Sequence, residues 1–234
     1  MNNLKSASTL LISIAASTLL MACGGTDSLP AKFEVTLTNL TTGQPLSPLV
    51  AIAHGSGFSL FSVGQPASVE LEQLGESGET APLVTSAKAS SGYMDSAVGS
   101  GAVSPGASSM VTVSVTQYDL ASAKLSLASM LVNTNDAITS VNAENLSGLD
   151  VGAELSLNLM SYDIGTEANS ESAATIPGPA GGGTGFVAAR DDVRDAVHLH
   201  PGAITADDGL SGSALSAMHR WDNPVALIKI VRIE

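Results

Sequence analysis

Alternation of hydrophobic and polar residues is the strongest pattern along this chain. In residues 33–40, FEVTLTNL, the apolar residues Phe33, Val35 and Leu37 alternate with polar ones. This two-residue period is typical of a strand with one buried face. The same period returns in residues 110–118, 124–132, 154–160 and 225–233, and clusters of Gly, Pro, Asn and Ser separate these segments. The pattern predicts an all-β fold, an antiparallel sandwich or barrel.

Helical periodicity is scarce. Its best example is PASVELEQLGESG at residues 66–78, where Val69, Leu71 and Leu74 share one helical face and Gly75 is positioned to end the helix. Residues 176–186 are rich in Gly and Pro, and strand-like sequence resumes beyond them. We therefore expect one short helix and a long surface loop within a single domain.

The first 23 residues have the pattern of an export signal. Lys5 precedes the apolar run LLISIAASTLLMA, which ends at Cys23, the only cysteine. The segment around Cys23 resembles a bacterial lipobox, which implies a signal peptide at residues 1–22, lipid attachment at Cys23, a tether at 23–31 and a folded domain at 32–234. Gly24 after the cysteine is compatible with sorting to the outer membrane. The alternative is an ordinary signal peptide that leaves a free thiol.

The charge balance narrows the classes of partner. The chain has 22 acidic and 9 basic residues, a formal net charge of −13. Such a chain is a poor ligand for nucleic acid or for anionic lipid surfaces, and it favours cations. A single cysteine allows no intramolecular disulfide, so a core or a metal must hold the fold together.

Acidic residues gather where one predicted strand ends. Residues 161–172, SYDIGTEANSES, place Asp163 and Glu167 four residues apart around Gly165, and Glu171 follows closely. A solvated turn explains this pattern if the Asp163 side chain accepts a backbone N–H and Glu167 faces water. A cation site is the alternative, although acidic loops are more often simply solvated.

Three segments together resemble one known family. Residues 46–79 read LSPLVAIAHGSGFSLFSVGQPASVELEQLGESGE, residues 125–138 read LSLASMLVNTNDAI, and residues 162–167 read YDIGTE. In this order and spacing they are similar to the spondin domain, the N-terminal domain type of F-spondin and mindin. The resemblance implies an antiparallel C2-like sandwich of about eight strands. This sequence differs from the animal motif around Asp136, where it lacks the prolines and the aromatic residue of that motif.

The resemblance also implies a divalent cation, calcium, at one end of the sandwich. The positions matched to its ligands are Asp136, Asp163 and Glu167, with Glu167 in place of a more usual Asp. Calcium takes six to eight oxygen ligands, and Gly165 allows the sharp turn that would return Glu167 toward Asp163. Asp119, at the end of another predicted strand, is a weaker fourth candidate.

A rival site is suggested by AVHLHPG, in which His198 and His200 lie two residues apart and would face one side of a strand. A zinc site would need a third ligand, and His54, His219 and Asp195 are scattered along the chain. Otherwise the two histidines simply precede a Pro-Gly turn. We expect a packing role for His54.

The only tryptophan, Trp221, is expected to anchor the last strand or, alternatively, to stack on a ligand.

The sequence has no G-x-S-x-G, H-E-x-x-H or P-loop motif, and we expect no enzyme. The expected function is that of a lipid-anchored envelope protein whose calcium-binding spondin domain acts in binding or adhesion to an extracellular protein or glycan. The alternatives are a metal-dependent surface hydrolase using His198 and His200, and a purely structural envelope lipoprotein.

Overall fold

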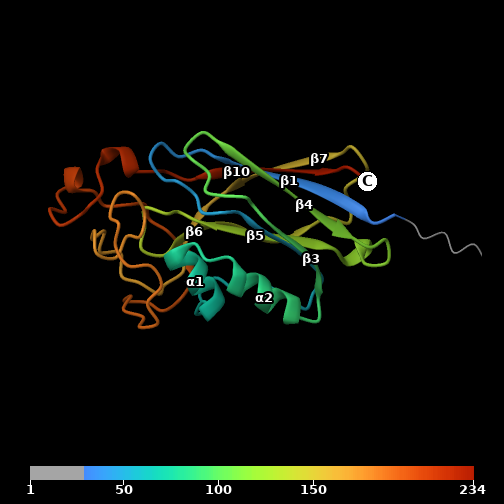
Figure 1. The fold of residues 1–234 in the computed structure, drawn as a ribbon, viewed down its shortest axis with the longest axis horizontal. Helices are drawn as coiled ribbons and strands as arrows, with labels where there is room; N and C mark the ends of the chain where they lie inside the picture. Colours follow the sequence, from blue (N-terminus) through green and yellow to red (C-terminus); the bar gives the residue numbers. More distant parts are fainter. Residues whose placement is uncertain (1–28) are drawn as a thin grey trace, which may run out of the picture.

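A computed structural model describes residues 29–234, which form two antiparallel β-sheets packed face to face (Figure 1). The prediction of an all-β sandwich is confirmed. The described residues contain ten strands, four in one sheet and six in the other, where about eight were expected. The expected signal peptide and Cys23 lie outside the described residues. No helix within residues 29–234 has the length and apolar character needed to cross a bilayer.

The four-stranded sheet is the part that the alternating pattern predicts best. Its strand order is β4-β1-β10-β7. Along β1 every second residue is buried, and Phe33, Val35 and Leu37 point into the core as expected. The strands are β1 (Ala31–Asn39), β4 (Ser108–Val115), β7 (Glu154–Leu159) and β10 (Ala226–Arg232).

The six-stranded sheet has the order β3-β2-β5-β6-β8-β9 and is covered on both faces. Its strand β2 is buried at all five positions, so its sequence shows no alternation. The strands are β2 (Val50–His54), β3 (Tyr93–Val98), β5 (Lys124–Met130), β6 (Ala137–Asn145), β8 (Ser161–Asp163) and β9 (His198–Leu199).

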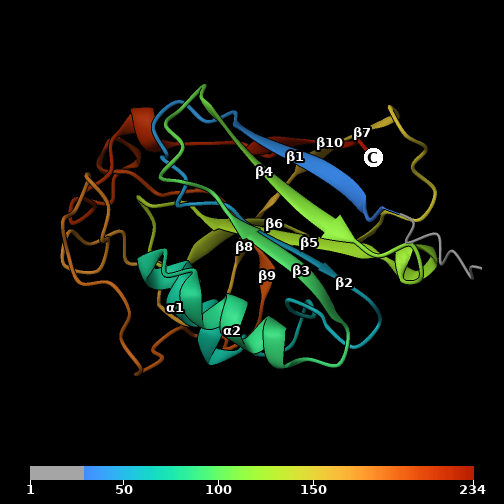
Figure 2. The same ribbon diagram turned by 45° about the vertical axis from the view of Figure 1, so that its right-hand side comes forward.

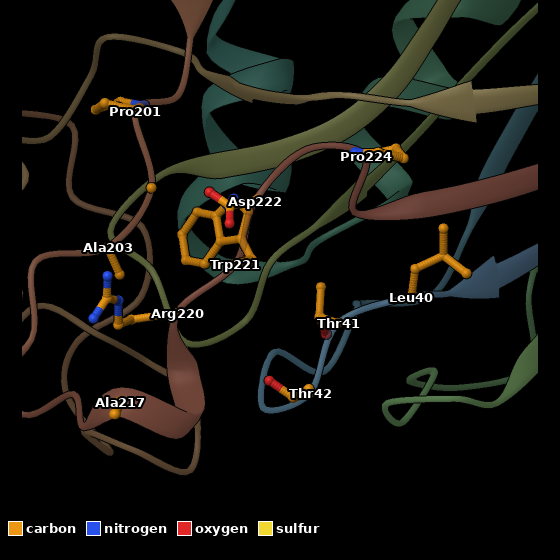
Figure 3. A pocket seen from close by; sticks show the side chains of 11 residues that line it. Leu40, Thr41, Thr42, Pro201, Ala203, Ala217, Arg220, Trp221, Asp222 and Pro224 are labelled. Carbon is orange, nitrogen blue, oxygen red and sulfur yellow. The ribbon is translucent and has the colours of Figure 1, made fainter.

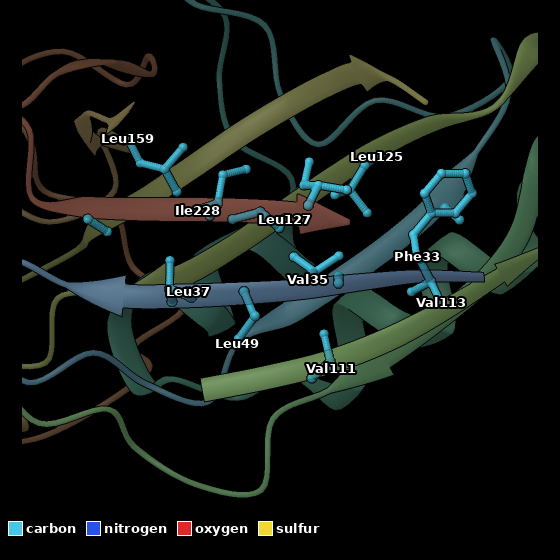
Figure 4. Close-up of a cluster of buried hydrophobic side chains, with 14 of the residues drawn as sticks. Phe33, Val35, Leu37, Leu49, Val111, Val113, Leu125, Leu127, Leu159 and Ile228 are labelled. Atoms are coloured by element: carbon cyan, nitrogen blue, oxygen red, sulfur yellow. The ribbon is translucent and has the colours of Figure 1, made fainter. Parts of the chain in front are cut away.

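The main core fills the space between the sheets. Side chains from both sheets pack together in this core (Figure 4). They include Phe33 and Val35 of β1, Ile228 of β10, and Leu125 and Leu127 of β5. Burying each such side chain stabilises the fold by roughly 1.5–3 kcal/mol. This core supplies the rigid frame from which the loops at the ends of the strands project.

Two helices, α1 (Val69–Ser77) and α2 (Ala81–Ala89), cover the outer face of the six-stranded sheet (Figure 2). The Ser68 hydroxyl accepts the N–H of Leu71 and caps α1, as N-cap serines do. Leu71 and Leu74 are buried against the sheet.

The predicted helix is wrong in two details, and α2 was not predicted. Val69 is 54% exposed and does not share the buried face. The helix also continues through Gly75 and ends at Gly78, whose φ of 71° is the left-handed conformation typical of a helix end. Gly75 has a packing role instead, because a Cβ there would collide with Ile164.

Long loops gather at one end of the sandwich, beside α1 (Figures 1 and 2). They include residues 164–197 and the segment that holds the 3₁₀ turns η2 (Ala206–Asp208) and η3 (Ala217–His219). A third 3₁₀ turn, η1 (Leu120–Ser122), precedes β5. The Gly- and Pro-rich loop at 176–186 is tightly packed: Ile176 is fully buried, and a side chain at Gly178 would collide with the backbone of Val132.

Candidate metal centre

The two loops that the sequence singles out lie beside each other. Asp136 immediately precedes β6, Asp163 ends β8, and these strands pair with Ala137 opposite Asp163. Both carboxylates are fully buried. Antiparallel pairing therefore brings residues from 27 positions apart in the chain into one acidic region.

Asp136 has two carboxylate oxygens in opposite situations. Its Oδ2 accepts the N–H groups of Thr166 (2.7 Å) and Glu167 (3.1 Å) and the hydroxyl of Thr166 (3.1 Å). Its Oδ1 is buried and has no hydrogen-bond partner among residues 29–234. Burial, together with the nearby charge of Asp163, raises the pKa of Asp136 to about 7, although the donors to Oδ2 oppose that shift.

Glu167 is also buried, only 7% exposed, and its Oε2 has no hydrogen-bond partner in the part of the chain that the structure describes. Burial and the charge of Glu76 raise the pKa of Glu167 to about 7, with a smaller contribution from Asp136. The expectation of a solvated Glu167 is therefore wrong. Packing of the loop after β8 against α1 removes this side chain from water.

Glu76 is the residue that sequence reasoning missed. It lies in the last turn of α1 and is 1% exposed. Its Oε2 accepts the N–H of Val187 (2.9 Å), while its Oε1 has no hydrogen-bond partner among the described residues. Burial raises its pKa. The last turn of α1 has no basic residue, and an acid there is opposed by the helix dipole. That unfavourable position is the sequence signal that could have identified it.

Asp163 is better satisfied than its neighbours. Its Oδ1 accepts the N–H of Gly165 (2.8 Å), and its Oδ2 accepts the Asn169 side chain (2.5 Å). The bond to Gly165 is the turn contact that the solvated-turn interpretation predicts, although Asp163 itself is buried. Gly165 has a φ of 76°, so it provides the sharp turn that was expected.

Two further acidic side chains border this region. Glu171 is buried, its Oε1 accepts the N–H of Ile204 (3.1 Å), and burial raises its pKa to about 7. Glu72 of α1 is paired with Arg190, whose Nε and Nη2 donate to Glu72 Oε2 at 3.0 and 2.6 Å. This ion pair holds the loop around residue 190 against α1.

Asp136, Glu167 and Glu76 thus offer oxygen atoms of the type that hard cations bind. In the described part of the chain, each has one buried oxygen without a hydrogen-bond partner, and the charges of Glu76 and Asp136 both raise the pKa of Glu167. Within residues 29–234, no three His, Cys, Asp or Glu side chains already surround one point as metal ligands would. The carboxylates are neighbours whose burial and repulsion a cation would relieve.

The two histidines of the rival site differ in their hydrogen bonds. His198 Nδ1 contacts the carbonyl of Ala196 (2.9 Å), and its Nε2 lies 3.7 Å from Asp163 Oδ2. His200 Nδ1 accepts the N–H of Gly202 (3.0 Å), which places the ring proton on Nε2. His200 as bonded here therefore presents no free lone pair to a metal.

The other candidate ligands lie apart from this pair. His54 hydrogen-bonds Ser126 (2.7 Å) and packs against Phe58, while Asp195 is paired with Arg190. His219 accepts the N–H of Ser216. Asp119 accepts the Thr116 hydroxyl in an exposed turn before β5, whereas Asp136 follows β5, so the two lie at opposite ends of that strand.

Comparison with known proteins adds one finding. The Spondin_N family model matches residues 32–177, more than half of the chain, and this range includes Glu76, Asp136, Asp163 and Glu167. A search of curated proteins found no match.

Proposed function

This chain belongs to the Spondin_N family, and we propose that it is a binding module whose loops are held by a calcium ion. The observation that carries the proposal is the set of buried carboxylate oxygens without partners on Asp136, Glu167 and Glu76. A buried charge is normally paired, protonated or bound to a metal. Calcium suits a site of several carboxylates supplemented by amide and hydroxyl oxygens.

The proposed ligands combine expected and unexpected residues. Asp136 and Glu167 would bind through their free oxygens, and Glu76 would add a third carboxylate from α1. Asp163 would bind through lone pairs that its bonds to Gly165 and Asn169 leave available. The ion would neutralise their charges and link α1 to the loops that precede β6 and follow β8.

Thermal unfolding of the purified protein tests the calcium proposal. Calcium at 100 times its dissociation constant should stabilise the protein by about 2.7 kcal/mol over the chelator-treated sample. The Tm would then rise by roughly 5–10 °C. Asp136→Asn should abolish this rise, while Asp150→Asn, in an exposed loop, should retain it. An equal calcium-induced rise in Asp136→Asn would contradict the site.

For the biological role, we propose binding or adhesion to an extracellular protein or glycan, from a lipid anchor at Cys23 on the cell envelope. The export pattern and the adhesive role of animal relatives support this. Calcium-dependent capture of a surface protein is expected, and it should be lost in Asp136→Asn. Capture of the same protein partners regardless of calcium would instead favour a structural envelope lipoprotein. The hydrolase alternative gains no support from the hydrogen bonds of His200.

A further inference from the structure

A cavity of about 490 Å³ opens beside Trp221, at the same end of the sandwich as the carboxylates but lined by other residues (Figure 3). Three segments form it: the loop after β1, the loop after β9, and the segment that precedes β10. In Figure 3 the Trp221 indole lies among the lining side chains, which include those of Asp222, Arg220, Thr41 and Thr42. The volume is that of a small-molecule site.

The Trp221 ring is held firmly in place. Its Nε1–H donates to the Ser161 hydroxyl (3.1 Å), which donates in turn to Asn223 Oδ1 (3.1 Å). Ser161 is fully buried at the start of β8, and the ring of His200 packs against the indole with centroids 5.1 Å apart. The indole is therefore a preorganised apolar platform, which a ligand can use without an additional ordering cost.

Polar groups with unused hydrogen-bonding capacity surround this platform. Asp222 is exposed, and its carboxylate has no hydrogen-bond or ion-pair partner within residues 29–234. Arg220 Nη1 is held by Asp208 at 3.0 Å, which leaves other guanidinium N–H groups available. The hydroxyl of Thr42 donates to the carbonyl of Met218 (3.0 Å) and can still accept a hydrogen bond.

We propose that this cavity binds a pyranose sugar, one ring of a glycan. A pyranose has an apolar C–H face that fits an indole, and a rim of hydroxyls that donate to a carboxylate and accept from a guanidinium. A quaternary ammonium ion would call for a cage of several aromatic rings, and Trp221 is the only aromatic residue of the lining. A phosphorylated ligand is disfavoured by the net charge of −13. The site does not depend on the proposed calcium ion.

The fluorescence of Trp221 tests this directly, because it is the only tryptophan in the chain. The purified protein is titrated in chelator with methyl β-glucopyranoside, N-acetylglucosamine and glucuronate, with sorbitol as the open-chain control. We expect a saturable change with at least one pyranose, with a dissociation constant on the order of 1 mM, and none with sorbitol. The indole N–H resonance of the protein should shift over the same concentration range.

Variants locate the binding site. Asp222→Asn should weaken sugar binding about tenfold without changing the Tm, since the carboxylate has no partner in the described fold. Asp150→Asn, the matched control near the opposite end of β10, should bind as the wild type does. Asp136→Asn should also bind sugar normally, which separates this site from the calcium site. The proposal would be overturned if no pyranose changed the Trp221 fluorescence or the indole N–H resonance, or if only tetramethylammonium did. Unchanged sugar affinity in Asp222→Asn would overturn it as well.

Discussion

At the residue scale, the two oxygens of Asp136 illustrate what makes the carboxylate region unusual. Three donors satisfy Oδ2, and none contacts Oδ1, although both atoms are buried. An unpaired buried polar atom destabilises a fold by roughly 1–3 kcal/mol. Glu76 in α1 and Glu167 in the loop after β8 each add another buried oxygen without a partner among the described residues, so the unfavourable contributions concentrate in one region. Such concentration is typical of functional sites.

Glu76→Gln tests whether a buried, unpaired carboxylate destabilises the fold in the absence of calcium. The amide oxygen can keep the bond from the Val187 N–H, while the amide group removes a buried charge. In chelator at about pH 7.5, we expect the variant to be more stable than the wild type by about 1 kcal/mol, a Tm increase of roughly 2–4 °C. Its stabilisation by calcium should be largely lost. Glu79→Gln, at an exposed position nearby, should change neither quantity. Destabilisation by Glu76→Gln in chelator would show that the buried Glu76 carboxylate is not unfavourable.

Sequence reasoning reached some of these residues and missed others for physical reasons. Asp136, Asp163 and Glu167 stood in motifs with a recognisable spacing. Glu76 follows Gly75, where the helix was expected to end, so no role was predicted for it. Its burial depends on contact between α1 and loops about 90–110 residues further along the chain, such as the bond from Val187. The local pattern of hydrophobic and polar residues cannot predict such a long-range contact.

At the scale of elements, the alternating pattern predicted β1, β4, β5, β7 and β10 within about three residues of their observed ends, but it did not predict β3 or β6. The pattern is clear in β1 and β4, where one face of the strand is buried. β2 is buried on both faces, and β8 and β9 have only three and two residues, so none shows a usable period. The loop after β8 is fixed by Gly165, where a side chain would collide with the backbone of Arg194 and Ala196.

Gly165→Ala should therefore be strongly destabilising, and Gly152→Ala provides the matched control. Both glycines have positive φ, 76° and 82°, but nothing lies within 4 Å of a Cβ built at Gly152. We expect Gly152→Ala to lower the free energy of unfolding by about 1 kcal/mol through backbone strain alone. Gly165→Ala should lower it by about 3 kcal/mol and weaken calcium binding. Denaturant unfolding compares the two, and equal losses would show that the Gly165 contact is not rigid.

At the scale of the whole molecule, the buried carboxyl groups determine how stability depends on pH. The pKa values of Asp136, Glu167 and Glu171 are raised to about 7 in the folded protein, mainly by burial. Between about pH 4 and 7 the folded state therefore holds more protons than the unfolded chain, so stability falls as pH rises. His200 acts in the opposite direction, because burial lowers its pKa to about 4. The combined effect of the three carboxyl groups on the pH dependence of stability is larger than the opposite effect of His200.

We therefore expect the chelator-treated protein to lose stability as the pH increases from about 4 to 7, with little further change just above pH 7. Added calcium should reduce or reverse this loss, because it favours the ionised carboxylates. Thermal unfolding over this range, with and without calcium, measures both effects. Stability that rises steadily with pH in chelator would mean that these carboxylates are ionised and satisfied without a cation.

The calcium site is best tested by calorimetric titration of the protein with calcium at about pH 7, in two buffers of different ionisation enthalpy. We expect saturable binding that releases protons, since Asp136 and Glu167 are partly protonated at that pH and must ionise to bind the metal. The measured heat should therefore depend on the buffer. Absence of binding, or binding without proton release that persists in Glu76→Gln and Asp136→Asn, would contradict it.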